Sequence, residues 1–212
     1  MDTLHYYFTI SSPWAYFGDH RMRSIADCYN LYLDYKPIDL VKLLSKTGGQ
    51  VLENRSSERK AYRLIELERW RRHLRLPLNL QPKYLQSSDT LANKLVIACT
   101  QLAIDPTNLA YELMRAFWVK DQDITNPVTL RNIIVSQSLN PTQLMNRAQD
   151  SQIADLLDFH TDEAISRGVF GVPSYVIGDE IFWGQDRLEL LDQKLTPRSD
   201  QNTTYIKQDH ES

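Results

Sequence analysis

The N-terminal part of the chain alternates between the patterns of a strand, a helix and a second strand, and this order restricts the fold more than any other feature. Residues 3–10 are rich in β-branched and aromatic side chains, which predicts a buried strand. Ser12 before Pro13 is typical of a helix start, with the serine as N-cap. Residues 31–36 alternate between apolar and polar side chains, the period of a strand that Pro37 ends. This order predicts a right-handed βαβ unit with parallel strands.

The C-terminal part has a complementary order. Residues 174–177 and 180–183 are two short apolar runs, and the Gly178-Asp179 pair between them is typical of a tight turn. Together they predict a β-hairpin. Leucines at helical spacing follow at positions 188, 191 and 195, and they predict an amphipathic helix. The chain therefore ends in a strand, strand, helix order.

The long middle of the chain carries helical patterns and almost no strand pattern. Helices are predicted over 58–74, 88–102, 108–119 and 150–167, and after two Asn-Pro starts, Asn126-Pro127 and Asn140-Pro141. The whole order predicts an α/β fold, a thioredoxin-like βαβ…ββα sheet interrupted by an all-helical insertion domain. We expect a discontinuous thioredoxin-like domain (1–40 and 165–195), a helical insertion domain (41–164) and a loosely ordered polar tail (196–212).

Composition argues against several classes of function. A net charge of −3 over 212 residues argues against a nucleic-acid binder held by bulk charge. No apolar run approaches the roughly 20 residues of a membrane span, and residues 1–10 lack the segments of a secretory signal. The five histidines lack metal-ligand spacing, and the two cysteines, Cys28 and Cys99, form neither a disulfide framework nor a Cys-x-x-Cys pair. We expect a soluble, reduced, cytoplasmic protein that binds no metal, nucleic acid or membrane.

The junction between the first strand and the first helix is where a thioredoxin-type fold carries its reactive group, and here it reads Ser11-Ser12-Pro13-Trp14. A helix N-terminus offers unpaired backbone N–H groups and a partial positive charge, so it stabilises an anion such as a thiolate. A serine without an adjacent base does not become that anion, but its hydroxyl can donate a hydrogen bond to one. The chemistry suggests a thiolate that arrives with a bound molecule, although capping alone is the usual role of a serine at this position. The alternative is that Ser12 only caps the helix.

Two further segments combine turn residues with groups that suit a ligand. A cis Val172–Pro173 bond would expose the backbone of Val172 to a peptide-like ligand, whereas a trans bond would make an ordinary loop. The segment Trp183-Gly184-Gln185-Asp186 closes the hairpin and opens the last helix. The side chain of Asp186 suits the ammonium of a ligand, and the backbone N–H groups of Gln185 and Asp186 suit its carboxylate. The alternative is structural, since an acidic residue in a first helical turn is favourable in any protein.

Three segments carry a resemblance to a known family: YYFTISSPWAY at 6–16, RGVFGVPS at 167–174 and FWGQDRL at 182–188. In this order and spacing they resemble the 2-hydroxychromene-2-carboxylate isomerases. That family is similar to the kappa-class glutathione transferases, within the DsbA-like thioredoxin-fold group. The resemblance spans residues 1–195 and implies a homodimeric, glutathione-dependent isomerase of a small aromatic substrate, with glutathione as cofactor. The helical insertion would then supply the aromatic-substrate pocket.

The resemblance also implies roles for individual residues. It assigns the catalytic role to Ser12, which would hydrogen-bond the sulfur of glutathione. It assigns backbone pairing with the cysteinyl unit to Val172, beside Pro173. An asparagine that reaches the site corresponds to Asn54, with Gln50 as the alternative because the loop length differs. The γ-glutamyl site corresponds to Trp183, Gly184, Gln185 and Asp186.

Other interpretations remain open. A kappa-class-like glutathione transferase or peroxidase would use the same site and consume glutathione, and a DsbA-like thiol- or peptide-binding protein would bind without turnover. A disulfide oxidoreductase is disfavoured, since no cysteine stands where exchange needs one. The basic run from Arg55 to Arg75 is typical of a solvated helix with many ion pairs. Alternatively, an arginine in that run faces the cleft and receives a carboxylate of glutathione or substrate.

Overall fold

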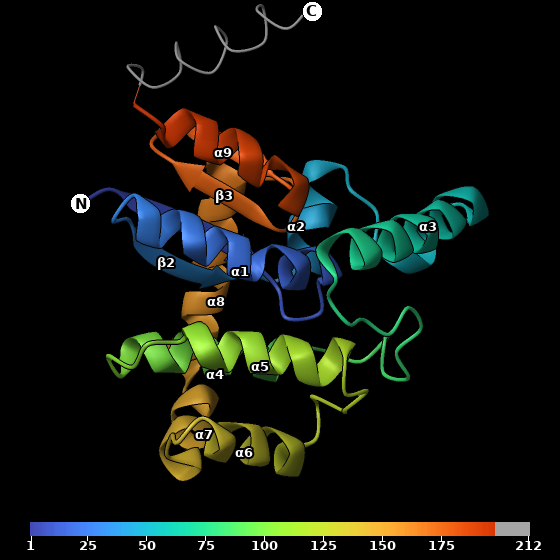
Figure 1. Ribbon diagram of the computed structural model, residues 1–212. Coiled ribbons are helices and arrows are strands. Elements are labelled where there is room, and N and C mark those ends of the chain that lie inside the picture. The colour runs from blue at the N-terminus through green and yellow to red at the C-terminus, as the bar shows by residue number, and fades with distance from the viewer. Residues whose placement is uncertain (198–212) are drawn as a thin grey trace, which may run out of the picture.

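The computed structural model describes residues 1–197, and a mixed sheet lies at its centre (Figure 1). The predicted βαβ unit is confirmed: it consists of β1 (Thr3–Phe8), α1 (Pro13–Cys28) and β2 (Tyr32–Pro37). β1 and β2 pair in parallel along their whole length. The end of β1 and the start of α1 therefore lie at one edge of the sheet, where the sequence predicts a site.

The predicted C-terminal hairpin is also confirmed. β3 (Ser174–Ile177) and β4 (Glu180–Trp183) pair antiparallel, and β3 also pairs antiparallel with β1, on the edge that β2 does not occupy. The described strands therefore have the order β2-β1-β3-β4. A single 3-10 turn, η2 (Gln185–Arg187), leads into the last described helix, α9 (Leu188–Leu195). Asp186 consequently lies in this turn and not in the first turn of the last helix, which corrects its predicted position.

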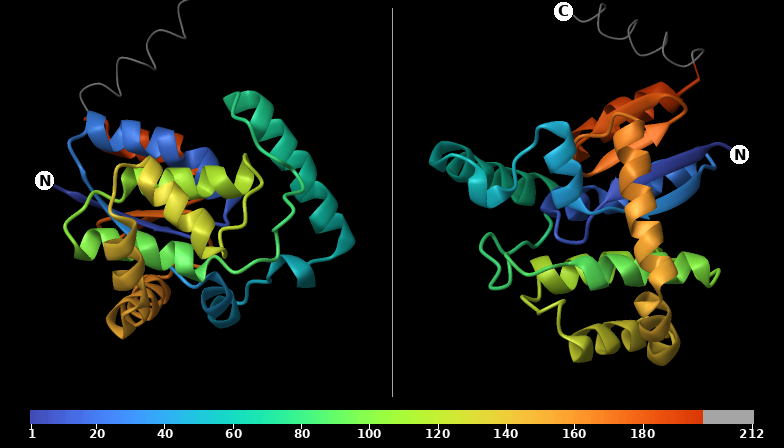
Figure 2. Two further views of the ribbon diagram at one scale, coloured as in Figure 1. Left: turned by 90° about the horizontal axis from the view of Figure 1, so that it is seen from below. Right: turned by 180° about the vertical axis from the view of Figure 1, so that it is seen from behind.

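Helices cover both faces of the sheet. α1 and α9 lie side by side on one face, whereas α8 (Ser151–Ser166) and α2 (Leu40–Thr47) lie on the other (Figures 1 and 2). The alternation of β1 explains the two layers, because Tyr6 and Phe8 pack in the core on the first face and Tyr7 packs on the second. The described part of the chain thus has the predicted α/β, thioredoxin-like fold.

The middle of the chain is helical, as predicted. Asn126 and Asn140 accept hydrogen bonds from the backbone N–H groups of the helices that they precede, which confirms both as N-caps. The sequence analysis missed two short elements, α2 and the 3-10 turn η1 (Leu52–Asn54). The other helices of the insertion are α3 (Ser57–Leu74), α4 (Thr90–Gln101), α5 (Thr107–Trp118), α6 (Pro127–Ser136) and α7 (Pro141–Gln149).

α8 connects the helical insertion to the sheet. Near its start, Ile153 and Leu157 pack against Ile97 of α4. Near its end, Glu163 forms an ion pair with Lys36 of β2. One continuous helix therefore spans both parts of the fold (Figure 2). The predicted tail lies outside the described residues from position 198 onward, and no described helix has the length and apolar character to cross a membrane.

Aromatic rings fill the core between the sheet and α1. Tyr6 stacks on Phe8 with ring centroids 4.3 Å apart and on Tyr175 of β3 at 5.4 Å, and it meets Tyr35 of β2 edge-on at 5.5 Å. All four side chains are buried. Large aromatic surfaces of this kind dominate the burial energy of a small sheet. They fix β1, and hence the start of α1, against its neighbours.

One charged group lies beneath this cluster and makes stability depend on pH. Asp19 of α1 is completely buried, with the guanidinium of Arg23 2.5 Å away. Burial raises the pKa of the Asp19 carboxyl from 3.8 to about 6, and the charge of Arg23 opposes that rise only in part. Because the folded state holds the proton more tightly than the unfolded chain, the contribution of Asp19 to stability falls as pH rises from about 4 to 7.

We therefore expect the free energy of unfolding of Asp19→Asn, relative to that of wild type, to be higher at pH 7.5 than at pH 4. The change in pKa corresponds to about 3 kcal/mol, which is the upper limit for this difference. Urea unfolding of both proteins at the two pH values measures it, and groups that titrate equally in both proteins cancel. An effect of the substitution that is the same at pH 4 and pH 7.5 would show that the carboxyl does not titrate in this range.

Candidate active site

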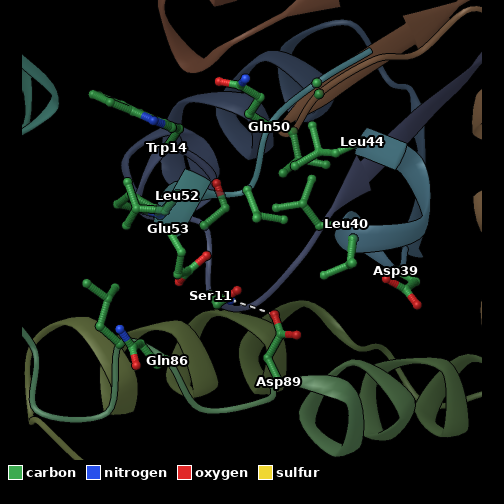
Figure 3. Close-up of a pocket in the computed structure, with 18 of the residues that line it drawn as sticks. Ser11, Trp14, Asp39, Leu40, Leu44, Gln50, Leu52, Glu53, Gln86 and Asp89 are labelled. Carbon is green, nitrogen blue, oxygen red and sulfur yellow. Dashed lines mark hydrogen bonds between the residues drawn. The ribbon is translucent and has the colours of Figure 1, made fainter. Parts of the chain in front are cut away.

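A pocket of about 640 Å³ opens at the edge of the sheet where α1 begins. Its wall comes from five places: the β1–α1 junction, the segment from the N-cap of α2 through the first half of α3, the loop before α4 with its first turn, Leu157 of α8, and the residues around β3 and β4. Figure 3 shows the first three of these segments around the pocket, with Ser11 bonded to Asp89. Segments far apart in the sequence therefore meet around one cavity. Its volume falls in the range of small-molecule sites.

Ser12 lies in the wall of this pocket, as predicted, and it caps α1. Its side chain is 5% exposed, and its Oγ accepts a hydrogen bond from the backbone N–H of Ala15 at 3.2 Å. Pro13 occupies the first helical position, and the first turn of α1 contains no acidic side chain. The capping role and a ligand role are compatible, because a capping oxygen uses a lone pair and leaves the hydroxyl proton free to donate.

A hydrogen-bond network from α4 fixes the loop before Ser12. Asp89 accepts from the backbone N–H of Ser11 at 2.9 Å and from the hydroxyl of Thr9. Asn93, one turn later, donates to the same Thr9 hydroxyl at 2.9 Å and accepts from the backbone N–H of Ile10 at 3.1 Å. The helical insertion thereby sets the position of the β1–α1 junction. The sequence analysis missed this network.

The Val172–Pro173 bond is cis, which is the alternative that suits a peptide-like ligand. Gly171 and Val172 line the pocket, and the carbonyl oxygen of Pro173 accepts from the backbone N–H of Gly184 at 2.9 Å. A Cβ on Gly171 would lie 2.5 Å from the indole nitrogen of Trp183. Only glycine therefore lets the ring of Trp183 pack this closely against the loop before β3.

The predicted γ-glutamyl segment has one residue in the pocket wall. Trp183 lines the pocket, is half exposed, and packs edge-on against Phe170 with centroids 4.6 Å apart. Gln185 is buried and faces away, since its carbonyl oxygen accepts from Arg21 of α1 at 2.8 Å and its side chain accepts from the same guanidinium. Asp186 lies outside the wall and forms an ion pair with Arg187 at 2.7 Å. Gly184 and Gln185 also lie outside the wall.

The structure brings Gln50, and not Asn54, into the pocket wall, which corrects the choice between the two candidates. Leu52 and Glu53 of η1 contribute to the wall, whereas Asn54 at the end of this 3-10 turn is exposed to solvent. The backbone carbonyl of Gln50 accepts from Nε of Arg55 at 3.1 Å. The loop between α2 and η1 therefore presents a different amide side chain to the pocket.

Three arginines also reach the pocket wall: Arg55, Arg59 and Arg63. Arg69 and Arg72 form ion pairs with glutamates of the same helix, as the interpretation of a solvated helix predicts. The three arginines in the wall face the pocket, and their binding of a carboxylate stays a prediction. The four-residue spacing of Arg59 and Arg63 was a usable signal, because it places both side chains on one face of α3, whereas Arg55 precedes the helix in extended conformation.

The described residues supply no thiol to this pocket. Cys28 is exposed at the far end of α1, and Cys99 is buried in α4, where burial raises the pKa of its thiol to about 12. Neither cysteine belongs to the wall. Among the described residues, no group of three or more histidine, cysteine or acidic side chains could hold a metal ion. The arrangement therefore suits binding of an anionic sulfur from outside more than disulfide exchange.

Comparisons with known proteins show the family of this chain and its similarity to two kinds of enzyme. A family model described as a DSBA-like thioredoxin domain matches residues 3–196. A 2-hydroxychromene-2-carboxylate isomerase of Pseudomonas putida is 27% identical over 195 residues, which cover 90% of this chain and 92% of that protein. Glutathione S-transferase kappa 2 of Caenorhabditis elegans is 23% identical, over 86% of this chain and 87% of that protein.

A solved structure gives the same picture for the fold. The structure of a 2-hydroxychromene-2-carboxylate isomerase superposes with a TM-score of 0.80 at 24% identity, covering 96% of this chain and 98% of that one. The resemblance that the three sequence segments predict is therefore confirmed.

Proposed function

We propose that this chain, which belongs to the DSBA-like thioredoxin domain family, is a glutathione-dependent isomerase of 2-hydroxychromene-2-carboxylate-type aromatic compounds. The observation that carries the proposal is Ser12, which caps α1 in a pocket wall that contains no cysteine of the described chain. The names of the curated relatives support an enzymatic role of the isomerase or glutathione transferase kind.

The start of α1 suits a thiolate that a ligand brings. Because Oγ of Ser12 accepts from Ala15, its proton is left to donate to sulfur. A hydrogen bond to a charged group contributes about 1.5–3 kcal/mol. The partial positive charge of the helix end acts in the same direction, with no acidic side chain in the first turn to oppose it. We therefore expect glutathione to bind with its sulfur ionised.

The rest of the tripeptide is assigned to residues of the pocket wall and of the segment that follows Trp183, outside the wall. The backbone of Val172 is the candidate for pairing with the cysteinyl unit, beside Pro173. Gln50 takes the role first given to Asn54, since it offers an amide in the wall. For the γ-glutamyl end, Asp186 is the candidate partner of the ammonium, and the backbone N–H groups of Gln185 and Asp186 are the candidates for the carboxylate. Trp183 and Gly184 complete this end of the site.

Bound glutathione would supply a thiolate that adds to the conjugated system of the substrate, makes a double bond rotatable, and leaves unchanged on elimination. The protein itself holds the sulfur of glutathione and the aromatic ring of the substrate in place. Ser12 donates to the sulfur in its anionic state before addition and after elimination. The apolar wall around Trp14, Leu44 and Phe170 packs an aromatic ring and excludes water. Cytoplasmic location and a homodimer belong to the same proposal, and light scattering tests the dimer.

The product stoichiometry separates this proposal from a kappa-class-like transferase or peroxidase. An isomerase leaves the thiol titre unchanged over many turnovers, whereas a transferase or peroxidase consumes at least one thiol per product. We expect a constant titre with 5,5′-dithiobis(2-nitrobenzoate) while absorbance follows substrate conversion. A titre that falls in step with product would support the transferase or peroxidase. Tight calorimetric binding of glutathione without turnover of any aromatic electrophile would support the DsbA-like thiol- or peptide-binding alternative.

A further inference from the structure

One face of α3 and of the turn before it presents three guanidinium groups to the pocket. Arg55, Arg59 and Arg63 follow one another at intervals of four residues, and all three belong to the pocket wall. Among the described residues, none of the three forms an ion pair. On the outward side of the same helix, Arg69 pairs with Glu66 at 2.6 Å and Arg72 pairs with Glu68 at 2.5 Å. The three pocket arginines thus differ from Arg69 and Arg72, whose charges are balanced by glutamates of the same helix.

Burial makes the unpaired charges of Arg63 and Arg55 costly, whereas Arg59 is exposed. Arg63 lies over the indole ring of the buried Trp118, 5.9 Å from the ring centroid. Burial and the neighbouring charge of Arg55 lower the pKa of Arg63 to about 10. Burial and the charge of Arg59 also lower the pKa of Arg55, and only Glu53 acts against this. The pocket wall therefore concentrates positive charge, since three guanidinium groups line it.

The acidic residues of the pocket wall do not neutralise this face. Asp89 is occupied by Ser11 and Thr9, and Asp39 caps α2 by accepting from the backbone N–H of Lys42 at 3.0 Å. Glu53 is exposed and forms no ion pair among the described residues. Three like charges therefore line the pocket without a carboxylate partner among the described residues, and two of them, Arg55 and Arg63, are partly buried. This arrangement points to an anionic ligand as the missing partner.

We propose that Arg55, Arg59 and Arg63 form a carboxylate-binding subsite of this pocket, with Arg63 as its innermost donor. The inference rests on the proposed function for the identity of its ligands, which offer two sources of a carboxylate: the aromatic acid and the glycine end of glutathione. A planar guanidinium matches a carboxylate with two parallel hydrogen bonds. The ring of Trp118 beneath Arg63 holds that guanidinium in place.

Calorimetric titration without turnover tests the subsite. The probes are trans-cinnamate against trans-cinnamamide, and glutathione against its glycine monoethyl ester, so that each pair differs in one carboxylate. The proteins are the wild type, Arg63→Gln and Arg59→Gln. Arg69→Gln is the matched control, because it removes an outward arginine of the same helix. Circular dichroism checks that each variant is folded.

We expect wild type to bind at least one of the two carboxylate probes about ten-fold or more tightly than its neutral partner. Arg63→Gln should reduce that preference to near unity, Arg59→Gln should reduce it in part, and Arg69→Gln should leave it intact. A preference within the cinnamate pair assigns the subsite to the aromatic acid, and one within the glutathione pair assigns it to glycine. No preference in either pair, or one that survives Arg63→Gln, would overturn the proposal. Since the assay needs no reaction, loss of the proposed isomerase activity alone would leave the subsite standing.

Discussion

Ser12→Ala should lower turnover ten-fold or more and leave the fold intact. The substitution removes one hydrogen bond to a charged sulfur, which contributes about 1.5–3 kcal/mol, and that energy corresponds to about ten-fold to more than a hundred-fold in rate. The capping bond to Ala15 is lost as well and costs about 1 kcal/mol of stability, which a folded domain of this size tolerates. Steady-state kinetics at saturating glutathione measures the effect on turnover, and thermal unfolding measures the effect on stability.

Ser11→Ala is the matched control for this substitution. Ser11 is adjacent in sequence and also lines the pocket, but the network uses its backbone N–H group and not its side chain. Its removal should therefore change turnover less than the removal of Ser12. Wild-type activity in Ser12→Ala would remove that hydroxyl from the mechanism.

Asp186→Asn should raise the KM for glutathione about ten-fold or more and leave kcat little changed. In the proposed function its carboxylate binds the ammonium of the γ-glutamyl end, and a hydrogen bond to a charged group contributes about 1.5–3 kcal/mol. This carboxylate lies close to the backbone of Gly184, which has a φ of +105. The ammonium lies far from the reacting sulfur, so the contact is equal in the ground and transition states, and losing it affects KM alone.

The ion pair between Asp186 and Arg187 supplies the control. The two side chains are 42% and 51% exposed, and an exposed pair of this kind contributes about 0–1 kcal/mol. Arg187→Gln should therefore change the KM for glutathione by much less than Asp186→Asn. A large loss of kcat with unchanged KM in Asp186→Asn would mean that this carboxylate acts near the sulfur, and that the γ-glutamyl end binds elsewhere.

Local chemistry made most of the fold predictable. Ser12, Asn126 and Asn140 cap helices through hydrogen bonds to residues two or three positions along the chain, so the signal is contained in a few neighbouring letters. Strand periods and the Gly178-Asp179 turn work over equally short distances. The order of such elements was then enough to predict the sheet. The short α2 was missed because eight residues give few repeats of the helical period.

The network behind Ser12 was not predictable in this way. Thr9 and Asp89 are separated by 80 positions, and Ile10 and Asn93 by 83, and these contacts form only when the helical insertion packs on the sheet. A single sequence holds no local pattern for such a pair. Asp89 did carry a weak signal, since it stands at a helix start, but its side chain makes no capping bond there and binds Ser11 instead.

The choice between Gln50 and Asn54 depended on loop geometry. Gly48 ends α2 in a left-handed conformation, at φ 76, and the chain then turns through η1 before α3 begins. The path of this loop decides whether the side chain of Gln50 or that of Asn54 points into the pocket, and composition alone does not determine that path. The basic run was not divided into inward and outward arginines for the same reason. The spacing of Arg59 and Arg63 marks one face of α3, but the position of Arg55 depends on the turn before the helix.

An ultraviolet difference titration of bound glutathione tests the central claim, that the start of α1 holds the sulfur as a thiolate through Ser12. The thiolate band is followed against pH in saturated wild type and Ser12→Ala, with S-methylglutathione as the blank. We predict a midpoint below pH 7 for wild type, against about 8.5 for an ordinary cysteine thiol, and a midpoint about one to two pH units higher for Ser12→Ala. A wild-type midpoint near 8.5, or equal midpoints in the two proteins, would contradict the account.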